Sequence, residues 1–245
     1  MTVKRAGLYR FCMDDLADGV VLDTVPRPAR RRKSAPAVRP RDAEKTKSDI
    51  LRAARDEFCE EGLNGARVDS IAARAKANKR LLYAYWGNKE ALYSAVLLDA
   101  YREIRQGERE LKLSKYDPVE AIDRMVRFTF RHFLANPWFP RLLAIENLQN
   151  ARFLKQIKDL PALHSPLVAE LRDIVDRGRE AGVFRADVDP MQLYISIAGL
   201  GYFYVSNMKT LSVIFGRDLS HFALIQEREA QAVAMVLDYL RKGVG

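Results

Sequence analysis

The stretch RVDSIAARAKANKRLLYAYWGNK, residues 67–89, contains two short helical patterns separated by a polar break. In the first pattern, Val68, Ile71, Ala72 and Ala75 recur at the spacing that places apolar side chains on one face of a helix. This first pattern therefore predicts a short amphipathic helix.

The second pattern begins with cations and ends with aromatic residues. Asn78 follows a break in the helical period and is a good N-cap, because its side-chain oxygen can accept from the free N–H groups of the next turn. Lys79 and Arg80 follow at the helix start, and Leu82 is expected to point back towards the first helix. Two short helices joined by a tight turn are typical of a helix-turn-helix unit, whose second helix lies in the DNA major groove. Two small helices of an ordinary bundle would give the same pattern.

Positive charge is concentrated in the first part of the chain. The 245 residues carry a formal net charge of +9 and a pI near 9.6, which favours an anionic partner. Residues 1–90 contain 20 Lys/Arg against 13 Asp/Glu and therefore supply +7 of that charge. The asymmetry predicts a nucleic-acid-binding end and a near-neutral body, although a merely soluble basic surface would have the same composition.

The composition does not favour a secreted or membrane protein. Two cysteines, Cys12 and Cys59, are too few for a disulfide framework and fit a reducing cytoplasm. No apolar run reaches about 18 residues, and the N-terminal segment lacks the uninterrupted apolar core of a signal peptide. We therefore expect a cytoplasmic protein with no membrane partner.

The sequence contains no motif for catalysis or metal binding. It has no H-E-x-x-H, no G-x-S-x-G and no Gly-rich phosphate loop. His132 and His164 are not spaced as metal ligands. We expect neither an enzyme nor a cofactor or metal.

Residues 1–44 form a basic extension. Prolines at positions 26, 28, 36 and 40 oppose a stable helix, and residues 30–33 form a block of like charge. We expect disorder over roughly residues 23–44. Such an arm can run along DNA phosphates or enter the minor groove, and a solvated tail is the equally weighted alternative.

Helical periodicity continues through the rest of the chain, and no convincing strand pattern occurs. The sequence therefore predicts an all-α fold, with a helix-turn-helix domain at residues 45–90 and a helical domain at residues 91–245. Besides the two helices of residues 67–89, the expected helices are Thr46–Glu61, Lys89–Glu110, Asp117–Asn136, Trp138–Lys158, Leu167–Ala181, Asp189 to about Val205, and Leu219–Leu240. Asn88, Asp117 and Asp189 are the expected N-caps of the helices that they begin.

Three motifs resemble those of the tetracycline-repressor (TetR) family of bacterial regulators. They are F-x-x-x-G at residues 58–62, V-x-x-I-A at residues 68–72 and L-Y-x-Y-[FW]-x-x-K-E-x-L at residues 82–92. The resemblance implies an all-α homodimer in which three N-terminal helices bind DNA. Further helices would hold a small-molecule effector pocket and a dimer face.

The resemblance also implies which residues contact DNA. Cations can reach guanine or phosphate, and tyrosine hydroxyls suit phosphates. The implied DNA-contacting residues are Arg67, Asn78, Lys79, Arg80, Tyr83, Tyr85 and Lys89. The chain departs from the family pattern at Lys76 and Ala77 in the turn, and at Ala66 and Arg67, where a hydroxyl cap for the first short helix is lost.

The implied mechanism is repression of a roughly palindromic double-stranded operator, relieved by a small molecule of unknown identity. Polar or aromatic residues on otherwise apolar helices are candidates for the effector pocket, although aromatic residues at helical spacing are more often core. These candidates are Phe128, His132, Trp138, Asn147, Tyr202 and Asn207. The last two long helices should form the dimer face, where Gly199 and Gly201 would allow close helix approach. The alternative function is an all-α ligand- or partner-binding module whose helix-turn-helix no longer binds DNA.

Overall fold

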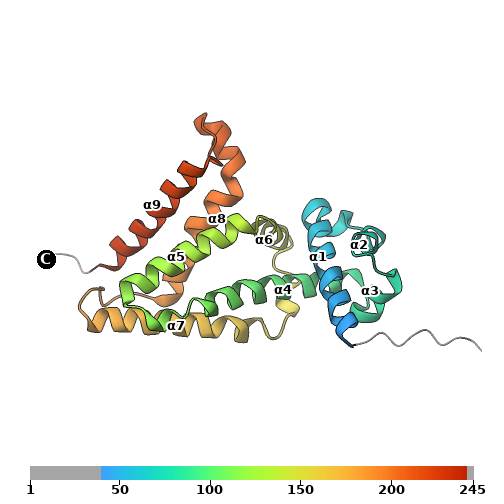
Figure 1. Cartoon of the computed structure of the whole chain (residues 1–245), viewed down its shortest axis with the longest axis horizontal. Coiled ribbons are helices and arrows are strands. Elements are labelled where there is room, and N and C mark those ends of the chain that lie inside the picture. The colour runs from blue at the N-terminus through green and yellow to red at the C-terminus, as the bar shows by residue number, and fades with distance from the viewer. Residues whose placement is uncertain (1–39, 242–245) are drawn as a thin grey trace, which may run out of the picture. The chain divides into compact units, whose positions relative to one another are not determined.

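The structure, a computed structural model, describes residues 40–241 (Figure 1). The expectations for residues 1–39 lie outside this range. The described residues form nine α-helices and no strand, apart from an isolated bridge between Phe184 and Arg241, so the all-α fold is confirmed. The helices are α1 (Pro40–Gly65), α2 (Val68–Arg74), α3 (Lys79–Trp86), α4 (Lys89–Glu110), α5 (Pro118–Ala135), α6 (Trp138–Leu148), α7 (Leu160–Glu180), α8 (Pro190–Phe215) and α9 (Phe222–Leu240).

Helix α1 extends beyond the predicted helix at both ends. Its first residue is Pro40, so the expectation of disorder through residue 44 is wrong for residues 40–44. Proline is tolerated in the first turn because an N–H there has no intrahelical acceptor. The helix was expected to stop at Gly62, which instead forms a kink with φ 69° and ψ 174°, and helical backbone resumes as far as Gly65. Glycine adopts this positive φ without a side-chain clash.

The region between α6 and α7 also differs from the prediction. The predicted helix to Lys158 ends at Leu148, where Asn150 and Ala151 then take positive φ angles of 54° and 55°. Helix α7 begins before Pro166 and continues through it. The missing proline N–H leaves the Ala162 carbonyl without its helical donor. The hydroxyl of the preceding Ser165 donates to that carbonyl at 3.2 Å, which compensates for the loss.

Four predicted N-caps are confirmed. Asn78 Oδ1 accepts from the N–H of residue 80 at 2.9 Å, and Asn88 Oδ1 accepts from that of residue 91 at 2.7 Å. Asp117 and Asp189 each accept from two backbone N–H groups at the starts of α5 and α8. Because each cap depends only on residues two or three positions away, the sequence pattern was sufficient to identify it.

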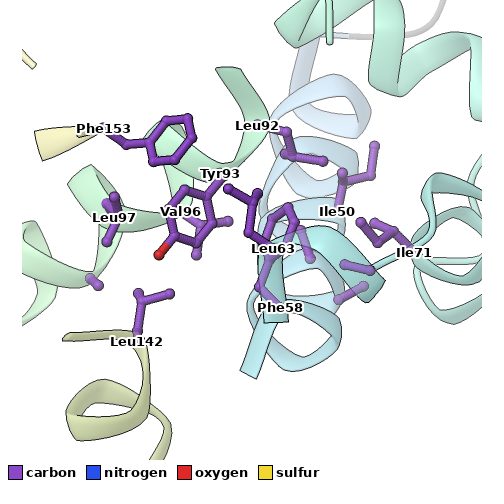
Figure 2. Close-up of a cluster of buried hydrophobic side chains, with 14 of the residues drawn as sticks. Ile50, Phe58, Leu63, Ile71, Leu92, Tyr93, Val96, Leu97, Leu142 and Phe153 are labelled. Carbon is purple, nitrogen blue, oxygen red and sulfur yellow. The ribbon is translucent and has the colours of Figure 1, made fainter. Parts of the chain in front are cut away.

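Two clusters of buried side chains hold the helices together. In the first, shown in Figure 2, Phe58 of α1 and Phe153 contact opposite sides of Tyr93 on α4, with ring centroids 5.0 and 5.1 Å away. The second cluster joins α5, α7, α8 and α9 through side chains such as Met125 and Leu171. Helix α4 contacts α1 and α3 near its start and α7 further along. The first cluster thus ties the helix-turn-helix to α4. Among residues 40–241, no helix is both long and apolar enough to span a membrane.

Candidate nucleic-acid interface and effector region

Helix α3 is attached along one side and open along the other. Leu82 is buried and packs in the first cluster, as its sequence position predicts. Asn78, Lys79 and Arg80 are exposed at the start of the helix, and Tyr83 is 46% exposed one turn later. The structure therefore brings these four predicted DNA-contacting residues onto an accessible part of α3.

An ion pair orients the first cation of α3. Lys79 Nζ lies 2.7 Å from Asp69 Oδ1 on α2, and this hydrogen bond raises the pKa of Lys79. The positive charge of Arg67, which is exposed at the start of α2, partly opposes that increase in the pKa of Lys79. Arg80 is exposed and forms no ion pair within residues 40–241. Arg80 is consequently the less restrained of the two cations at the start of α3.

Two other predicted DNA contacts are engaged within the protein. Lys89 Nζ donates to the carbonyl oxygen of Ala66 at 3.1 Å and to that of Asn64 at 3.4 Å. These bonds connect the start of α4 to the last turn of α1 and to Ala66, which follows it. Tyr85 is half-buried, and Lys47 Nζ lies 5.3 Å from its ring centroid. Both residues help to assemble the unit, whatever further contacts they make.

The residue that precedes α2 is held by a side chain of another helix. Arg67 makes no side-chain cap; its backbone N–H donates to Oε1 of Glu57 on α1 at 3.0 Å. The other oxygen of this buried carboxylate lies 3.3 Å from Arg74 Nε, and Arg74 also pairs with the exposed Glu60. No sequence motif identified Glu57 as a residue that holds this unit together. Its only signal was an acidic residue directly beside Phe58 in the apolar stripe of the first helix.

Four of the six candidate effector residues belong to one aromatic group. The ring of Phe139 lies 5.7 Å from His132 and 5.8 Å from Trp138, and Phe128 lies 5.8 Å from His132. Tyr202 joins the group through Phe133. A groove of about 600 Å³ is lined in part by Phe128 and His132.

The remaining two candidates are separate from this group. Asn147 is exposed on α6. Asn207 donates to the Phe203 carbonyl of its own helix and to Ser206 Oγ. Within residues 40–241, neither asparagine makes a ring contact or hydrogen bond with the aromatic group.

His132 is buried and neutral. Burial and the positive charge of Arg105 lower its pKa to about 4. Asn136 Nδ2 lies 3.4 Å from His132 Nδ1. His132 Nε2 has no hydrogen-bond partner among the described residues. The part of the chain that the structure describes has no group of three or more His, Cys, Asp or Glu side chains able to hold a metal ion. Burial raises the pKa of the Cys59 thiol to about 11, which disfavours a reactive thiolate.

Helices α8 and α9 carry most of the exposed large apolar side chains of the described residues. Phe203, Met235 and Tyr239 are among them and line a groove of about 550 Å³ between the two helices. A Cβ atom on Gly199 would meet no other atom within 4 Å, so this glycine faces open space. A Cβ on Gly201 would lie 3.1 Å from the ring of Phe133. Gly201 therefore permits α8 to approach α5 within one chain, which corrects its predicted role at a dimer face.

A capped helix-turn-helix with an exposed basic start, joined by α4 to a helical body, defines a helix-turn-helix DNA-binding regulator. Profiles of known families agree with this class. Residues 50–96 match "Bacterial regulatory proteins, tetR family", and residues 118–236 match "Tetracyclin repressor-like, C-terminal domain". The chain belongs to the TetR family.

Individual proteins support the same assignment. The HTH-type transcriptional repressor NicS of Pseudomonas putida is 35% identical over 207 residues, which are 84% of this chain and 96% of the relative. The HTH-type transcriptional repressor SCO4008 of Streptomyces coelicolor is 36% identical over 145 residues, covering 56% of this chain and 69% of that protein. The crystal structure of the protein SCO4942 from Streptomyces coelicolor has 25% identity and a TM-score of 0.59, and the match covers 80% of this chain and 98% of that one. The protein is therefore a DNA-binding transcriptional repressor rather than an enzyme.

Proposed function

We propose that the protein is a homodimeric cytoplasmic repressor that binds a roughly palindromic operator and leaves it when a small molecule binds. The exposed start of α3 carries this proposal, because it presents Asn78, Lys79, Arg80 and Tyr83 together on one capped helix. A recognition helix reads base edges with its N-terminal residues. Residues 45–90 would supply this DNA-binding domain, and residues 91–245 the effector-binding and dimerisation domain.

The exposed apolar side chains of α8 and α9 support the dimer. Contiguous exposed apolar surface on a soluble protein marks an interaction site, and a two-fold dimer buries the same surface on both subunits. Two subunits would then present two α3 helices to successive major grooves, which favours a palindromic site. Arg67, Tyr85 and Lys89 would contact the flanking backbone, with Tyr85 and Lys89 limited by their internal contacts.

DNA binding is tested by fluorescence anisotropy with duplexes from the region upstream of the protein's own gene. We expect Lys79→Ala and Arg80→Ala each to weaken specific binding by about 5- to 150-fold, and higher salt to weaken binding by all variants that bind. Arg172→Ala, an exposed arginine on α7, is the matched control and should bind as the wild type does. If no duplex binds in a salt-sensitive manner, the repressor proposal fails and the non-DNA-binding module becomes the better description.

The dimer is tested by light scattering on the wild type and two charged variants. The wild type should have a mass near twice 28.0 kDa. Phe203→Glu, in the groove between α8 and α9, should shift the protein towards the monomer because a buried unpaired charge is costly. Leu148→Glu changes a more exposed apolar residue, on α6, and should leave the mass unchanged. A monomeric wild type, or equal behaviour of the two variants, would contradict the proposed face.

A further inference from the structure

A mostly apolar groove of about 360 Å³ lies between α6 and α8, with contributions from the end of α5 and the first turn of α9. Residues 137, 140, 141 and 144 line it at the three- and four-residue spacing that places side chains on one face of α6. Its volume is in the range of small-molecule sites, about 300–1,000 Å³. The groove shares no lining residue with the groove between α8 and α9, where we place the dimer contact.

The charged side chains that line this groove are both cations. Arg141 of α6 and Lys209 of α8 line it, and none of its lining residues is acidic. Within residues 40–241, neither cation forms an ion pair or a side-chain hydrogen bond. The hydroxyl groups of Ser206 and Thr210 are already used, because they donate to carbonyl oxygens of α8 at 2.6 and 2.9 Å. The side-chain donors that remain for a ligand are therefore cationic, and they favour an acceptor with negative charge.

The larger groove at Phe128 and His132 lacks this feature. Three arginines line it, but each is paired with a carboxylate of α5 or α9. An anion bound there would have to compete with those carboxylates. Unpaired positive charge beside apolar surface therefore distinguishes the groove between α6 and α8 from the larger one.

Helix α6 connects the smaller groove to the DNA-binding domain. At its first residue, the Trp138 ring centroid lies 4.1 Å from the guanidinium carbon of Arg55 on α1. The carbonyl oxygen of Trp138 also accepts from Cys59 Sγ at 3.4 Å. One turn later, Leu142 packs in the first cluster with Tyr93 of α4 (Figure 2). A ligand that pushes α6 away from α8 would therefore move α6 against both α1 and α4.

Resting on the proposed effector function, we propose that the effector is a small amphipathic anion, with one acidic group and an apolar chain, that binds between α6 and α8. Arg141 and Lys209 bind the acidic group through charge-assisted hydrogen bonds. The chain packs against Pro140, Ala144 and Met208, which removes apolar surface from water. The bound molecule holds α6 in a position that the operator-bound dimer does not adopt, so operator affinity falls.

Isothermal titration calorimetry of the wild-type protein with octanoate as the probe tests this assignment. Octanamide has the same chain without the charge, and octylammonium reverses the charge, so each should bind at least about tenfold more weakly. Acetate keeps the charge without the chain and should also bind more weakly. Equal binding of octanoate and octanamide, or no detectable binding of octanoate, would overturn the proposal.

A double variant tests whether the two cations bind the acidic group. Arg141→Gln/Lys209→Gln removes two exposed charges that have no partner among the described residues, so the fold should be kept. It should lose at least about tenfold in octanoate affinity. Arg172→Gln, an exposed arginine of α7, is the matched control and should bind octanoate as the wild type does. Retained affinity in the double variant would overturn the role of the cations.

Ala144→Trp tests the position of the chain. This residue is exposed on α6, so the larger side chain fills the groove without entering the core, and octanoate affinity should fall. The mass from light scattering should remain that of the wild type. A lower mass would mean that the second subunit covers this groove, and unchanged octanoate affinity would mean that the chain lies elsewhere. Either result would overturn the site.

Duplex anisotropy with and without octanoate separates this proposal from the repressor function. Octanoate should weaken duplex binding by the wild type at least about fivefold and leave that of the double variant unchanged. Wild-type protein that binds the duplex but no octanoate overturns only the ligand assignment. Octanoate binding that leaves duplex affinity unchanged overturns the effector role of the groove. Protein that binds octanoate but no duplex leaves the ligand site standing and overturns the repressor function.

Discussion

Replacement of Glu57 by alanine perturbs the buried carboxylate that joins α1 to α2. In the wild type, Glu57 is 3% exposed, and its two oxygens approach the Arg67 N–H and Arg74 Nε. The variant leaves the Arg67 N–H without an acceptor and removes one of the two carboxylates that pair with Arg74. An unsatisfied buried donor costs about 1–3 kcal/mol. Because the Arg74 contact is lost as well, we expect a loss in the upper part of this range, about 2–3 kcal/mol.

Urea denaturation and thermal unfolding followed by circular dichroism measure this loss. For a domain of this size, 1 kcal/mol shifts the melting temperature by about 2–4 °C, so Glu57→Ala should melt about 5–10 °C lower. Glu57→Gln keeps an oxygen that can accept from the Arg67 N–H and should lose less. DNA affinity should fall as well, because α2 supports the α3 helix that carries Lys79 and Arg80.

Glu60→Ala provides the matched control. Glu60 also pairs with Arg74, but it is exposed and accepts no backbone N–H within residues 40–241. Exposed ion pairs contribute little, so this variant should unfold close to the wild type. The reasoning is refuted if Glu57→Ala is as stable as the wild type, or if the two alanine variants lose the same stability.

Three further predictions concern packing, protonation and capping. Gly178→Ala would place a Cβ against the buried Phe184 ring and should cost about 1–3 kcal/mol in urea denaturation. Gly199→Ala meets no atom of its own chain within 4 Å and should lose less, so equal midpoints would contradict this. For Glu108, burial raises the pKa from 4.5 to about 7, so the folded state holds the proton more tightly and wild-type stability declines as pH rises through this window. Urea denaturation measures the difference in unfolding free energy between Glu108→Gln and the wild type. This difference should rise in favour of the variant by about 1–3 kcal/mol from about pH 5 to about pH 8. A constant difference would show that the pKa of Glu108 is not raised in the folded state. By the same measurement, Asn78→Ala should lose about 1 kcal/mol of unfolding free energy because the cap of α3 is removed. Asn78→Ser keeps a side-chain oxygen and should lose very little. Equal stability of the two variants would mean that the cap does not stabilise α3.

The sequence predicted the features that depend on neighbouring residues. Asn78 and Asn88 were recognised as caps because the groups that they bind lie within one turn. The apolar period and the buried Leu82 were likewise readable from spacing. Helix type, helix order and the exposed start of α3 all follow from such local signals.

Features that depend on distant residues could not be read in the same way. Glu57 accepts from the N–H of Arg67, ten residues away, only because a kink at Gly62 turns the chain back. The sequence predicted Gly201 to lie at a contact between subunits, but the ring of Phe133 in the same chain faces it. The Arg105–Tyr194 bond joins residues 89 positions apart, and no periodicity of α4 identifies that partner. Sequence periodicity states which face of a helix is buried but not which residue it meets.

Helix α4 is the element through which an effector bound in the helical body would act on DNA binding. Its first turns are held in the first cluster, where Tyr93 contacts the ring of Phe58 on α1. A ligand changes an equilibrium only if it contacts two states differently, so a ligand that contacts α4, or a helix packed on α4, gains such a difference whenever α4 moves. Since α1 is packed on α4, a displacement of α4 would reorient the helix-turn-helix, and a coupling of about 1–3 kcal/mol is enough to lower operator affinity by about 5- to 150-fold.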